Sequence, residues 1–373
     1  MSKQILITGG AGFVGSHLAD GLLRSGHSVR ILDDLTPQVH TAGRPDYLSQ
    51  DVELIVGDVR DPNRLREVLT GVDVIYHFAA TVGVGQSMYE ISRYMSVNTQ
   101  GTAELLQALL DSKQTPQKLI VASSMSIYGE GRYRCSDCGA DAAPPVRSVA
   151  QLRSGAWDLP CDVCGGVLKP VPTDETKPSE INSVYALSKR DQEQLCLIYG
   201  RNYDLPVTAL RFFNIYGTRQ ALSNPYTGVA AVFASRMLNG NAPLVFEDGE
   251  QMRDFVSVHD IVRANMLAME RPQSNGEVIN IGCGRPITIR RVAELLSAAL
   301  GKELEPVITQ KYRAGDIRHC YADITKARRL LGYEPQVTHE EGFRELADWL
   351  RQQQPEDKAE TMLKELTAYG LTA

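Results

Sequence analysis

The most informative segment for the fold class is Ile5-Leu6-Ile7-Thr8-Gly9-Gly10-Ala11-Gly12-Phe13-Val14-Gly15. A short apolar run, typical of a buried strand, leads directly into a glycine-rich turn and then into a helical pattern over 16–23. Gly9 allows a tight turn, Gly12 lets backbone amides approach a pyrophosphate, and Gly15 lets the helix pack close to the strand. The N-terminus of that helix then faces the phosphates. The spacing therefore predicts a dinucleotide-binding unit, with a ligand-free glycine turn as the weaker alternative.

The end of the second expected strand indicates which dinucleotide is bound. The strand over 29–32 leads into Asp33-Asp34, at the distance expected for the acid that binds the adenosine ribose. A carboxylate there accepts hydrogen bonds from the 2′-hydroxyl and repels a 2′-phosphate. We therefore expect Asp33 to select NAD over NADP.

Tyr185-Ala-Leu-Ser-Lys189 and the strand end Ser123-Ser124 predict the chemistry. A phenol is a poor base at neutral pH, because its ordinary pKa is about 10. An ammonium four residues along a helix lies on the tyrosine's own face and stabilises the phenolate. Ser124 adds a third hydrogen bond to a substrate hydroxyl. This trio removes a proton from an alcohol while a nicotinamide takes the hydride. The Tyr-x-x-x-Lys spacing indicates this chemistry only in combination with the N-terminal dinucleotide-binding unit.

Length and charge limit the classes of partner. At 373 residues the chain is long enough for a large core and two lobes. The net charge of −6 and the pI near 5.7 give no reason to expect nucleic acid or an anionic membrane as a partner. The first strand follows Met1 almost directly, and no apolar run approaches membrane-spanning length. We expect a soluble, cytoplasmic protein.

Strands and helices alternate along the chain, which predicts an α/β fold with a Rossmann-type doubly wound parallel sheet. We expect an NAD-binding domain over 1–211, interrupted by an insertion at 130–172, and a smaller C-terminal α/β substrate lobe over 212–373. Some later segments should cross back into the first domain. The residues after Gln352 receive no function. The expected strands are 4–8, 28–32, 52–56, 73–77, 118–123 and 207–211, and the expected later helices are 289–300, 324–331 and 340–352.

Further motifs follow in a fixed order and extend the pattern over nearly the whole chain. They are Gly57-Asp58-Val59-Arg60-Asp61, His77-Phe-Ala-Ala80, Asn98, Arg211-Phe-Phe-Asn214-x-Tyr-Gly217, Arg253-Asp254-Phe255 and Arg313-x-Gly-Asp316. With the glycine turn and the Tyr185/Lys189 pair, they make the chain resemble the extended short-chain dehydrogenase/reductase family, specifically its nucleotide-sugar epimerases and dehydratases. The resemblance implies a tightly bound NAD. It implies these cofactor contacts: Gly9, Gly12, Phe13, Val14, Gly15, Asp33, Asp58, Val59, His77, Ala79, Ala80, Asn98, Tyr185, Lys189 and Phe212, with His77 structural rather than acid–base in role.

The family resemblance also narrows the reaction. Dehydratases of the family carry an Asp-Glu pair after the residue that Ser124 matches, decarboxylating members keep a glutamate at the second position, and 3,5-epimerases place a cysteine there. This chain has Met125 and Ser126 instead. The remaining trio, Ser124, Tyr185 and Lys189, is what a 4-epimerase requires.

The substrate implied by the resemblance is a nucleoside-diphosphate sugar. Arg253 and Arg313 suit its diphosphate, because a guanidinium binds phosphate bidentately, and Asn214, Ser126, Ser124 and Asp316 complete the expected contacts. Within the family the resemblance favours dTDP-L-rhamnose or a related dTDP- or UDP-hexose, in carbohydrate biosynthesis. A 4-ketoreductase or dehydrogenase, and a cofactor-bound scaffold without activity, are the alternatives.

The resemblance further implies a homodimer. Relatives pair the helices near 94–110 and 184–203 with their copies in a second subunit. Both helices carry apolar residues at three-to-four spacing beyond what one sheet face covers: Leu105, Leu106, Leu109, Leu195, Leu197 and Ile198.

The insertion carries four cysteines, as Cys135-x-x-Cys138 and Cys161-x-x-Cys164, with 22 residues between the pairs. This spacing predicts a tetrahedral zinc site of the zinc-ribbon kind; free thiols or two disulfides are the alternatives. Four thiolates leave no open position, so the zinc is expected to be structural. Five Lys/Arg balance five Asp/Glu from Glu130 to Lys169, which argues against nucleic-acid binding. We expect a lid or an oligomer contact.

Overall fold

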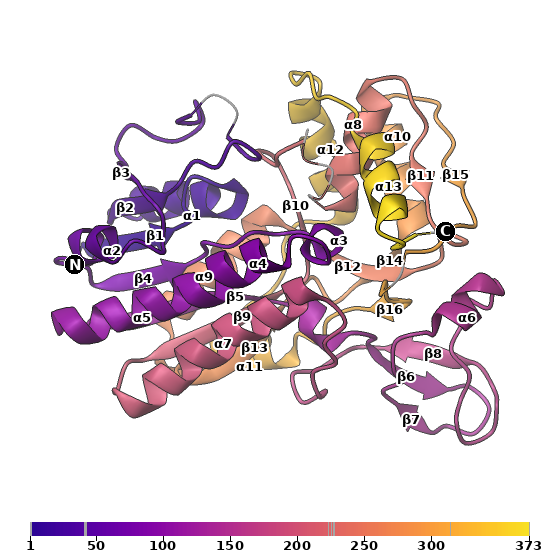
Figure 1. Cartoon of the computed structure of the whole chain (residues 1–373), viewed down its shortest axis with the longest axis horizontal. Helices are drawn as coiled ribbons and strands as arrows, with labels where there is room; N and C mark the ends of the chain where they lie inside the picture. The colour runs from indigo at the N-terminus through magenta and orange to yellow at the C-terminus, as the bar shows by residue number, and fades with distance from the viewer. Residues whose placement is uncertain are drawn as a thin grey trace.

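The computed structural model describes residues 2–40, 43–222, 224, 226, 228–313 and 315–372. Its centre is a seven-stranded sheet in the order β13-β9-β5-β4-β1-β2-β3, with every neighbouring pair parallel (Figure 1). This is the doubly wound sheet that the alternation of strands and helices predicts. The strands are β1 (Gln4–Thr8), β2 (Ser28–Asp33), β3 (Glu53–Val56), β4 (Val74–His77), β5 (Lys118–Ser124), β9 (Val207–Phe212) and β13 (Glu277–Ile281).

Helices cover both faces of this sheet and bury two apolar cores. One core contains residues of α1 (Phe13–Arg24), α9 (Val258–Glu270) and α11 (Thr325–Leu331). The other contains residues of α2 (Pro62–Val68), α5 (Gly101–Ser112) and α7 (Val184–Asn202). The six expected strands are confirmed to within a residue at their ends.

Strand β13 is an edge strand that no sequence pattern had singled out. It lies in the middle of the later part of the chain, yet it pairs with β9, so this segment returns to the first sheet. Its fourth residue, Asn280, is polar but fully buried, and accepts a 2.7 Å hydrogen bond from the Tyr128 hydroxyl. A buried polar residue in a run of five hides the apolar signature of a strand. The division of the chain at residue 211 stays a prediction.

The later part of the chain builds a second, smaller body beside the carboxyl end of the sheet (Figure 1). Its short sheets contain β10 (Asn214–Tyr216), β12 (Met252–Ser257), β14 (Pro286–Thr288) and β16 (His319–Cys320), and separately β11 (Leu244–Val245) and β15 (Val307–Ile308). Its helices are α8 (Val229–Leu238), α10 (Ile289–Leu300), α12 (His339–Leu350) and α13 (Ala359–Ala368), of which α8, α10 and α12 share one apolar core.

The insertion forms a module of its own that projects from one side of the molecule, next to β16 (Figure 1). It contains an antiparallel sheet in the order β7-β6-β8 and the short helix α6 (Val149–Arg153). The strands are β6 (Arg132–Cys135), β7 (Asp141–Ala142) and β8 (Leu168–Val171). Its core is small: Tyr133, Cys135, Leu159, Cys161 and Leu168. Such a core needs further support to stay folded.

The helices expected at a dimer interface are present, but their apolar residues are partly used inside the chain. The first runs through α4 (Ile91–Tyr94), a π-helical turn (Met95–Gln100) and α5; the second is α7. Leu105, Leu106 and Leu109 are buried in the core against the sheet, which corrects the reasoning that they exceed what one sheet face covers. The large apolar residues that remain exposed on these helices are Ile91, Leu110, Leu187 and Ile198. The homodimer itself stays a prediction.

Within the described residues, no helix combines the length and the apolar character needed to cross a membrane.

Candidate active site

The turn between β1 and α1 has the shape that its glycines predict. Gly9 has φ +71°, and a Cβ there would lie 2.7 Å from the backbone nitrogen of Ala79. A Cβ at Gly15 would lie 2.6 Å from the Cα of Gly10, so only glycine lets α1 pack so close to the turn. At Gly12 a Cβ would meet only the Gly9 carbonyl oxygen, at 3.4 Å, because this residue faces an open cleft. The helix N-terminus beside that space fits a pyrophosphate.

Asp33 lies at the end of β2 with its carboxylate on the same cleft. Its two oxygens accept hydrogen bonds from the backbone N–H groups of Ala11 and Leu35, both at 3.0 Å. Burial raises the pKa of Asp33, and these two hydrogen bonds oppose the shift. The turn and the acid are thus held in one rigid arrangement, as a ribose contact next to a pyrophosphate requires.

The cleft over the carboxyl end of the sheet has a volume of about 930 Å³. Most residues expected to contact the cofactor line it, namely Gly9, Gly12, Phe13, Val14, Gly15, Asp33, Asp58, Val59, Ala79, Ala80, Tyr185, Lys189 and Phe212. A dinucleotide therefore has a continuous wall from the β1–α1 turn to the tyrosine and lysine of α7.

His77 and Asn98 lie behind this wall rather than on it. The His77 ring is fully buried, with its nitrogens 2.8 Å from the hydroxyls of Thr8 and Thr102. Burial lowers its pKa to about 3, so it stays neutral. Asn98 is buried too, accepting from the Thr81 N–H and donating to Ser188. Through these hydrogen bonds both side chains hold together the segments behind the cleft wall.

The start of α7 brings the tyrosine to the cleft. Ser183 caps the helix, its hydroxyl accepting from the Ala186 N–H at 3.1 Å, and Tyr185 lies in the first turn. The Tyr185 N–H donates to the Ser87 hydroxyl at 3.0 Å. Burial raises the pKa of the Tyr185 phenol, and a hydrogen bond with the Ser124 side chain opposes this shift. The structure thus brings Tyr185 and Ser124, 61 positions apart in sequence, together at one point.

Lys189 follows one turn later on the same face and also lines the cleft. Its ammonium donates a 2.6 Å hydrogen bond to Gln192. Burial lowers its pKa to about 7, while Cys196 and Glu193 act in the opposite direction. The protonation of a lysine with such a pKa depends strongly on any charge that enters the cleft.

A second pocket, of about 310 Å³, continues from this point into the smaller body. The two cavities share Met125, Ser126 and Asn214 as lining residues. Ser126 Oγ and Asn214 Oδ1 are buried, and neither has a hydrogen-bond partner among the described residues. Buried polar atoms are costly when unpaired, and a polar ligand at this junction would supply the hydrogen bonds that these two atoms lack.

Three further expected substrate contacts line the second pocket: Arg253, Arg313 and Asp316. Asp316 lies between the arginines, accepting from Arg253 at 3.2 Å and from Arg313 at 2.7 Å. The two guanidinium groups hold its pKa down to about 2. One carboxylate against two cations leaves local positive charge, which suits a phosphate group.

The C-terminal segment forms an outer wall of this pocket, which sequence reasoning missed. Met362, Leu363 and Leu366 of α13 line the cavity. The carboxylate of Glu365 accepts hydrogen bonds from the hydroxyls of Tyr89 and Tyr226, the former at 3.1 Å. The only signal in the sequence is the short apolar spacing within α13, which by itself names no partner.

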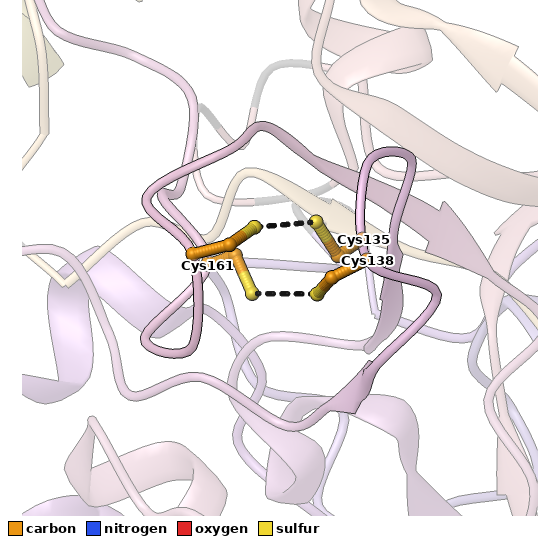
Figure 2. A group of neighbouring side chains, drawn as sticks. Cys135, Cys138 and Cys161 are labelled. Atoms are coloured by element: carbon orange, nitrogen blue, oxygen red, sulfur yellow. Dashed lines mark hydrogen bonds between the residues drawn. The ribbon is translucent and has the colours of Figure 1, made fainter.

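The four cysteines of the insertion converge from two loops (Figure 2). All four sulfur atoms lie within 4.8 Å of one another, with Cys135 and Cys164 3.4 Å apart and Cys138 and Cys161 3.7 Å apart. The edge of a tetrahedron of thiolates around zinc is about 3.8 Å, from Zn–S bonds of about 2.3 Å. A disulfide would need about 2.05 Å. The cluster therefore has the geometry of a metal site, and all four thiols are free.

The fold and the grouping of Ser124, Tyr185 and Lys189 in one cleft are those of the extended short-chain dehydrogenase/reductase class. Within it, the model of the NAD dependent epimerase/dehydratase family matches residues 5–148 and 161–282. The chain belongs to this family of enzymes.

Two curated relatives and a solved structure show the same likeness over nearly the whole length. The chain is 34% identical over 354 residues to the dTDP-L-rhamnose 4-epimerase of Burkholderia thailandensis, covering 94% of this chain and 96% of that protein. It is 34% identical over 360 residues to a UDP-N-acetyl-alpha-D-glucosaminuronate decarboxylase of Bacillus cytotoxicus, covering 94% and 99%. The UDP-glucuronic acid 4-epimerase of Bacillus cereus, solved with UDP-glucuronic acid and NAD, superimposes with a TM-score of 0.77 at 28% identity, covering 94% and 99%.

Proposed function

We propose that the protein is an NAD-dependent 4-epimerase of a nucleoside-diphosphate sugar. The observation that carries this proposal is the junction of the two cavities. The proton-transfer residues Tyr185 and Ser124 lie on one side of it, and the arginine-lined pocket opens on the other. The unpartnered atoms of Ser126 and Asn214 lie between them, where a sugar that spans both cavities would need hydrogen bonds.

The residues of this chain act on the sugar as an acid–base unit. Tyr185, as phenolate, takes the proton of the 4-hydroxyl, and Lys189 stabilises the phenolate charge. Ser124 donates a hydrogen bond to the oxygen at C4 as it becomes a carbonyl. When bound, NAD supplies the acceptor for the hydride of C4 and its later donor. After the 4-keto sugar turns over in the pocket, Tyr185 returns the proton to the same oxygen, with hydride addition to the opposite face.

The two positions after Ser124 favour epimerisation over elimination. Met125 and Ser126 line the junction, and neither side chain can serve as the carboxylic acid or carboxylate that expels water from a keto sugar. The site can therefore oxidise and reduce C4 but holds no second acid–base pair there.

For the substrate we propose dTDP-L-rhamnose or a related dTDP- or UDP-hexose, with Arg253 and Arg313 at the diphosphate. The likeness to the Burkholderia epimerase supports the first, and the UDP-sugar complexes among the solved relatives support the others. Asp33 supports NAD over NADP, because it lines the cleft at the end of β2, where the dinucleotide motif has the acid that binds the ribose.

Oxidative decarboxylation of a nucleotide uronate is a second candidate, favoured by the equal identity to the Bacillus decarboxylase. It begins with the same C4 oxidation, so the trio alone does not separate the two. Ser126 argues against it, because the resemblance places a glutamate at this position in decarboxylating members. A net 4-ketoreductase is the remaining alternative.

We also propose that Cys135, Cys138, Cys161 and Cys164 hold one structural zinc ion. The near-tetrahedral sulfur spacing and the small core of the insertion support this role, since metal binding supplies folding energy that such a core lacks. Four protein ligands would fill the ion's coordination, so it would take no part in catalysis.

The test is incubation of the purified protein with a panel of dTDP-, UDP- and GDP-sugars, including a uronate, without added cofactor in D₂O. We expect one sugar to reach a mixture of C4 epimers, with no lasting absorbance of reduced cofactor and no deuterium at C4. Release of CO₂ would favour the decarboxylase, and one equivalent of reduced cofactor per sugar would favour the dehydrogenase. If no sugar binds or reacts, the proposed function is wrong.

A further inference from the structure

Four buried charged side chains join the insertion to the substrate lobe. Glu130 and Arg147 come from the insertion, Glu247 and Arg318 from the lobe, and none is more than 4% exposed. Arg147 donates to both carboxylate oxygens of Glu247, at 2.8 and 2.9 Å, and Arg318 approaches the same carboxylate at 3.4 Å. We refer to these four residues as the buried ion-pair cluster. Two carboxylates thus face two guanidinium groups, and Arg318 also donates to Asp248, at 2.6 and 2.8 Å, and to Asp158, at 3.0 Å, so each buried charge of the cluster has an opposite one.

Glu130 holds the backbone of the lobe directly. Its carboxylate accepts from the N–H groups of Arg318 at 2.7 Å and His319 at 3.2 Å, and from the Tyr133 hydroxyl of β6 at 2.6 Å. The next residue, Gly131, donates its N–H to the His319 carbonyl at 2.8 Å. The first residues of the insertion therefore fix the position of the backbone at 318–319.

That backbone in turn positions the residues of the substrate pocket. Arg253 donates to the carbonyl oxygens of Arg318 at 2.9 Å and Ile317 at 2.7 Å, so its guanidinium is anchored on this segment. Asp316, which bridges Arg253 and Arg313, belongs to the same segment, and its carbonyl oxygen accepts from Arg147 at 3.3 Å. A shift of 316–319 would move both arginines of the pocket.

The other end of the Arg147 contact is a strained residue. Glu247 has φ +53°, a left-handed conformation that a non-glycine residue keeps only when its surroundings enforce it. It is preceded by Phe246, whose ring lies 4.9 Å from the guanidinium of Arg313. The bidentate pair with Arg147 thus holds the turn that places an aromatic face against Arg313.

We propose that the insertion is a positioning element for the diphosphate site, and that Arg147 is its central positioning residue. This rests on the proposed function, because the pocket must bind a nucleotide sugar for the positioning to matter. Arg147 touches neither cavity; it acts through Glu247 and Asp316 on Arg313 and Arg253. The cysteine cluster maintains the fold from which Arg147 reaches the lobe, so loss of its metal should weaken substrate binding without direct contact to substrate.

The test compares Arg147→Lys with Arg134→Lys in the full-length holoenzyme. Arg134 lies in the same module but is exposed and pairs with exposed Asp141. For Arg147→Lys we expect the KM of the nucleotide sugar to rise about 10- to 100-fold, the range for misplaced binding groups, with kcat and bound NAD within about twofold of wild type. Amide hydrogen exchange should accelerate at 315–319 and remain unchanged in β1 and β9. Arg134→Lys should behave as wild type in every measurement.

Unchanged exchange at 315–319 in Arg147→Lys would overturn the proposal. An unchanged KM would also overturn it, and so would a loss of bound NAD as large as the loss of nucleotide-sugar binding. If Arg147→Lys is recovered unfolded, Cys161→Ser tests the same connection between the insertion and the lobe, because it disturbs the cysteine cluster instead. Amide exchange at 315–319 must again accelerate in that variant. Wild-type protein that binds no nucleotide sugar would overturn the proposed function instead, and the exchange measurement would then decide the link by itself.

Discussion

Replacing Lys189 with methionine should abolish turnover and yet stabilise the folded chain. Lys189 is only 3% exposed, and burial lowers its pKa from 10.5 to about 7. The folded state therefore binds the lysine's proton less tightly than the unfolded chain does. Methionine fills a similar volume without carrying a charge into the interior.

The size and sign of the effect follow from the shift in pKa. Each unit corresponds to about 1.4 kcal/mol, so holding Lys189 in the folded state costs about 4 kcal/mol at pH 7. Between pH 7 and 10.5 the unfolded chain binds more protons than the folded chain, so stability rises with pH, and at pH 9.5 the cost falls to about 1 kcal/mol. Methionine also loses the hydrogen bond to Gln192, about 1 kcal/mol. The expected gain is about 3 kcal/mol at pH 7 and close to zero at pH 9.5.

Urea unfolding at the two pH values measures this difference, after bound NAD has been removed because the cofactor adds its own binding energy. Arg190→Met on the same helix is the control, since Arg190 is exposed and its loss should shift the midpoint equally at both pH values. A Lys189→Met variant that is less stable than wild type at pH 7, or whose gain does not fall with pH, would refute the reasoning from burial.

Four further outcomes are expected. Tyr185→Phe should retain NAD and abolish turnover, whereas Ser124→Ala should lower kcat by about ten- to a thousandfold; near wild-type kcat in Tyr185→Phe would show that another group is the base. Denaturation should release NAD rather than NADP, and Asp33→Ala should weaken NAD binding; recovery of mainly NADP would contradict the ribose assignment. Elemental analysis should find one zinc per chain, and Cys161→Ser should release it and make the insertion protease-sensitive while NAD stays bound; zinc-free wild type would exclude the site. Light scattering at micromolar concentration should show a homodimer that Ile198→Arg weakens; a wild-type monomer would disprove the pairing.

Motifs that act through neighbours in the chain were predictable from the sequence. The β1–α1 turn depends on which residues permit left-handed backbone and close packing, and Gly9 and Gly15 show both in the structure. Tyr185 and Lys189 share a helix face because of the helical repeat alone. The paired Cys-x-x-Cys loops likewise converge as their spacing indicates.

Contacts between residues far apart in the sequence were not predictable from it. His77 and Asn98 belong to the expected cofactor motif, and the fold places both behind the cleft wall, where His77 lies against Thr102 of α5 and Asn98 accepts from the Thr81 N–H. Leu105 and Leu109 were expected to exceed what one face of the sheet covers, yet neighbouring elements of the same chain bury them. A periodic pattern shows which face of a helix is apolar but not what covers that face.

The sequence was enough to predict the sheet and the dinucleotide turn, because local backbone sterics and apolar periodicity specify them, and it singled out Ser124, Tyr185 and Lys189, which the fold brings to one cleft. The tertiary structure was needed to show that α13 lines the second pocket and that Arg147 meets Glu247, 100 residues away. In the sequence, a charged residue of an inserted loop cannot be distinguished from a solvent-exposed charge, because its burial depends on the fold. Its partner is then chosen by the three-dimensional path of the chain, because a buried charge must find an opposite one wherever the fold brings it.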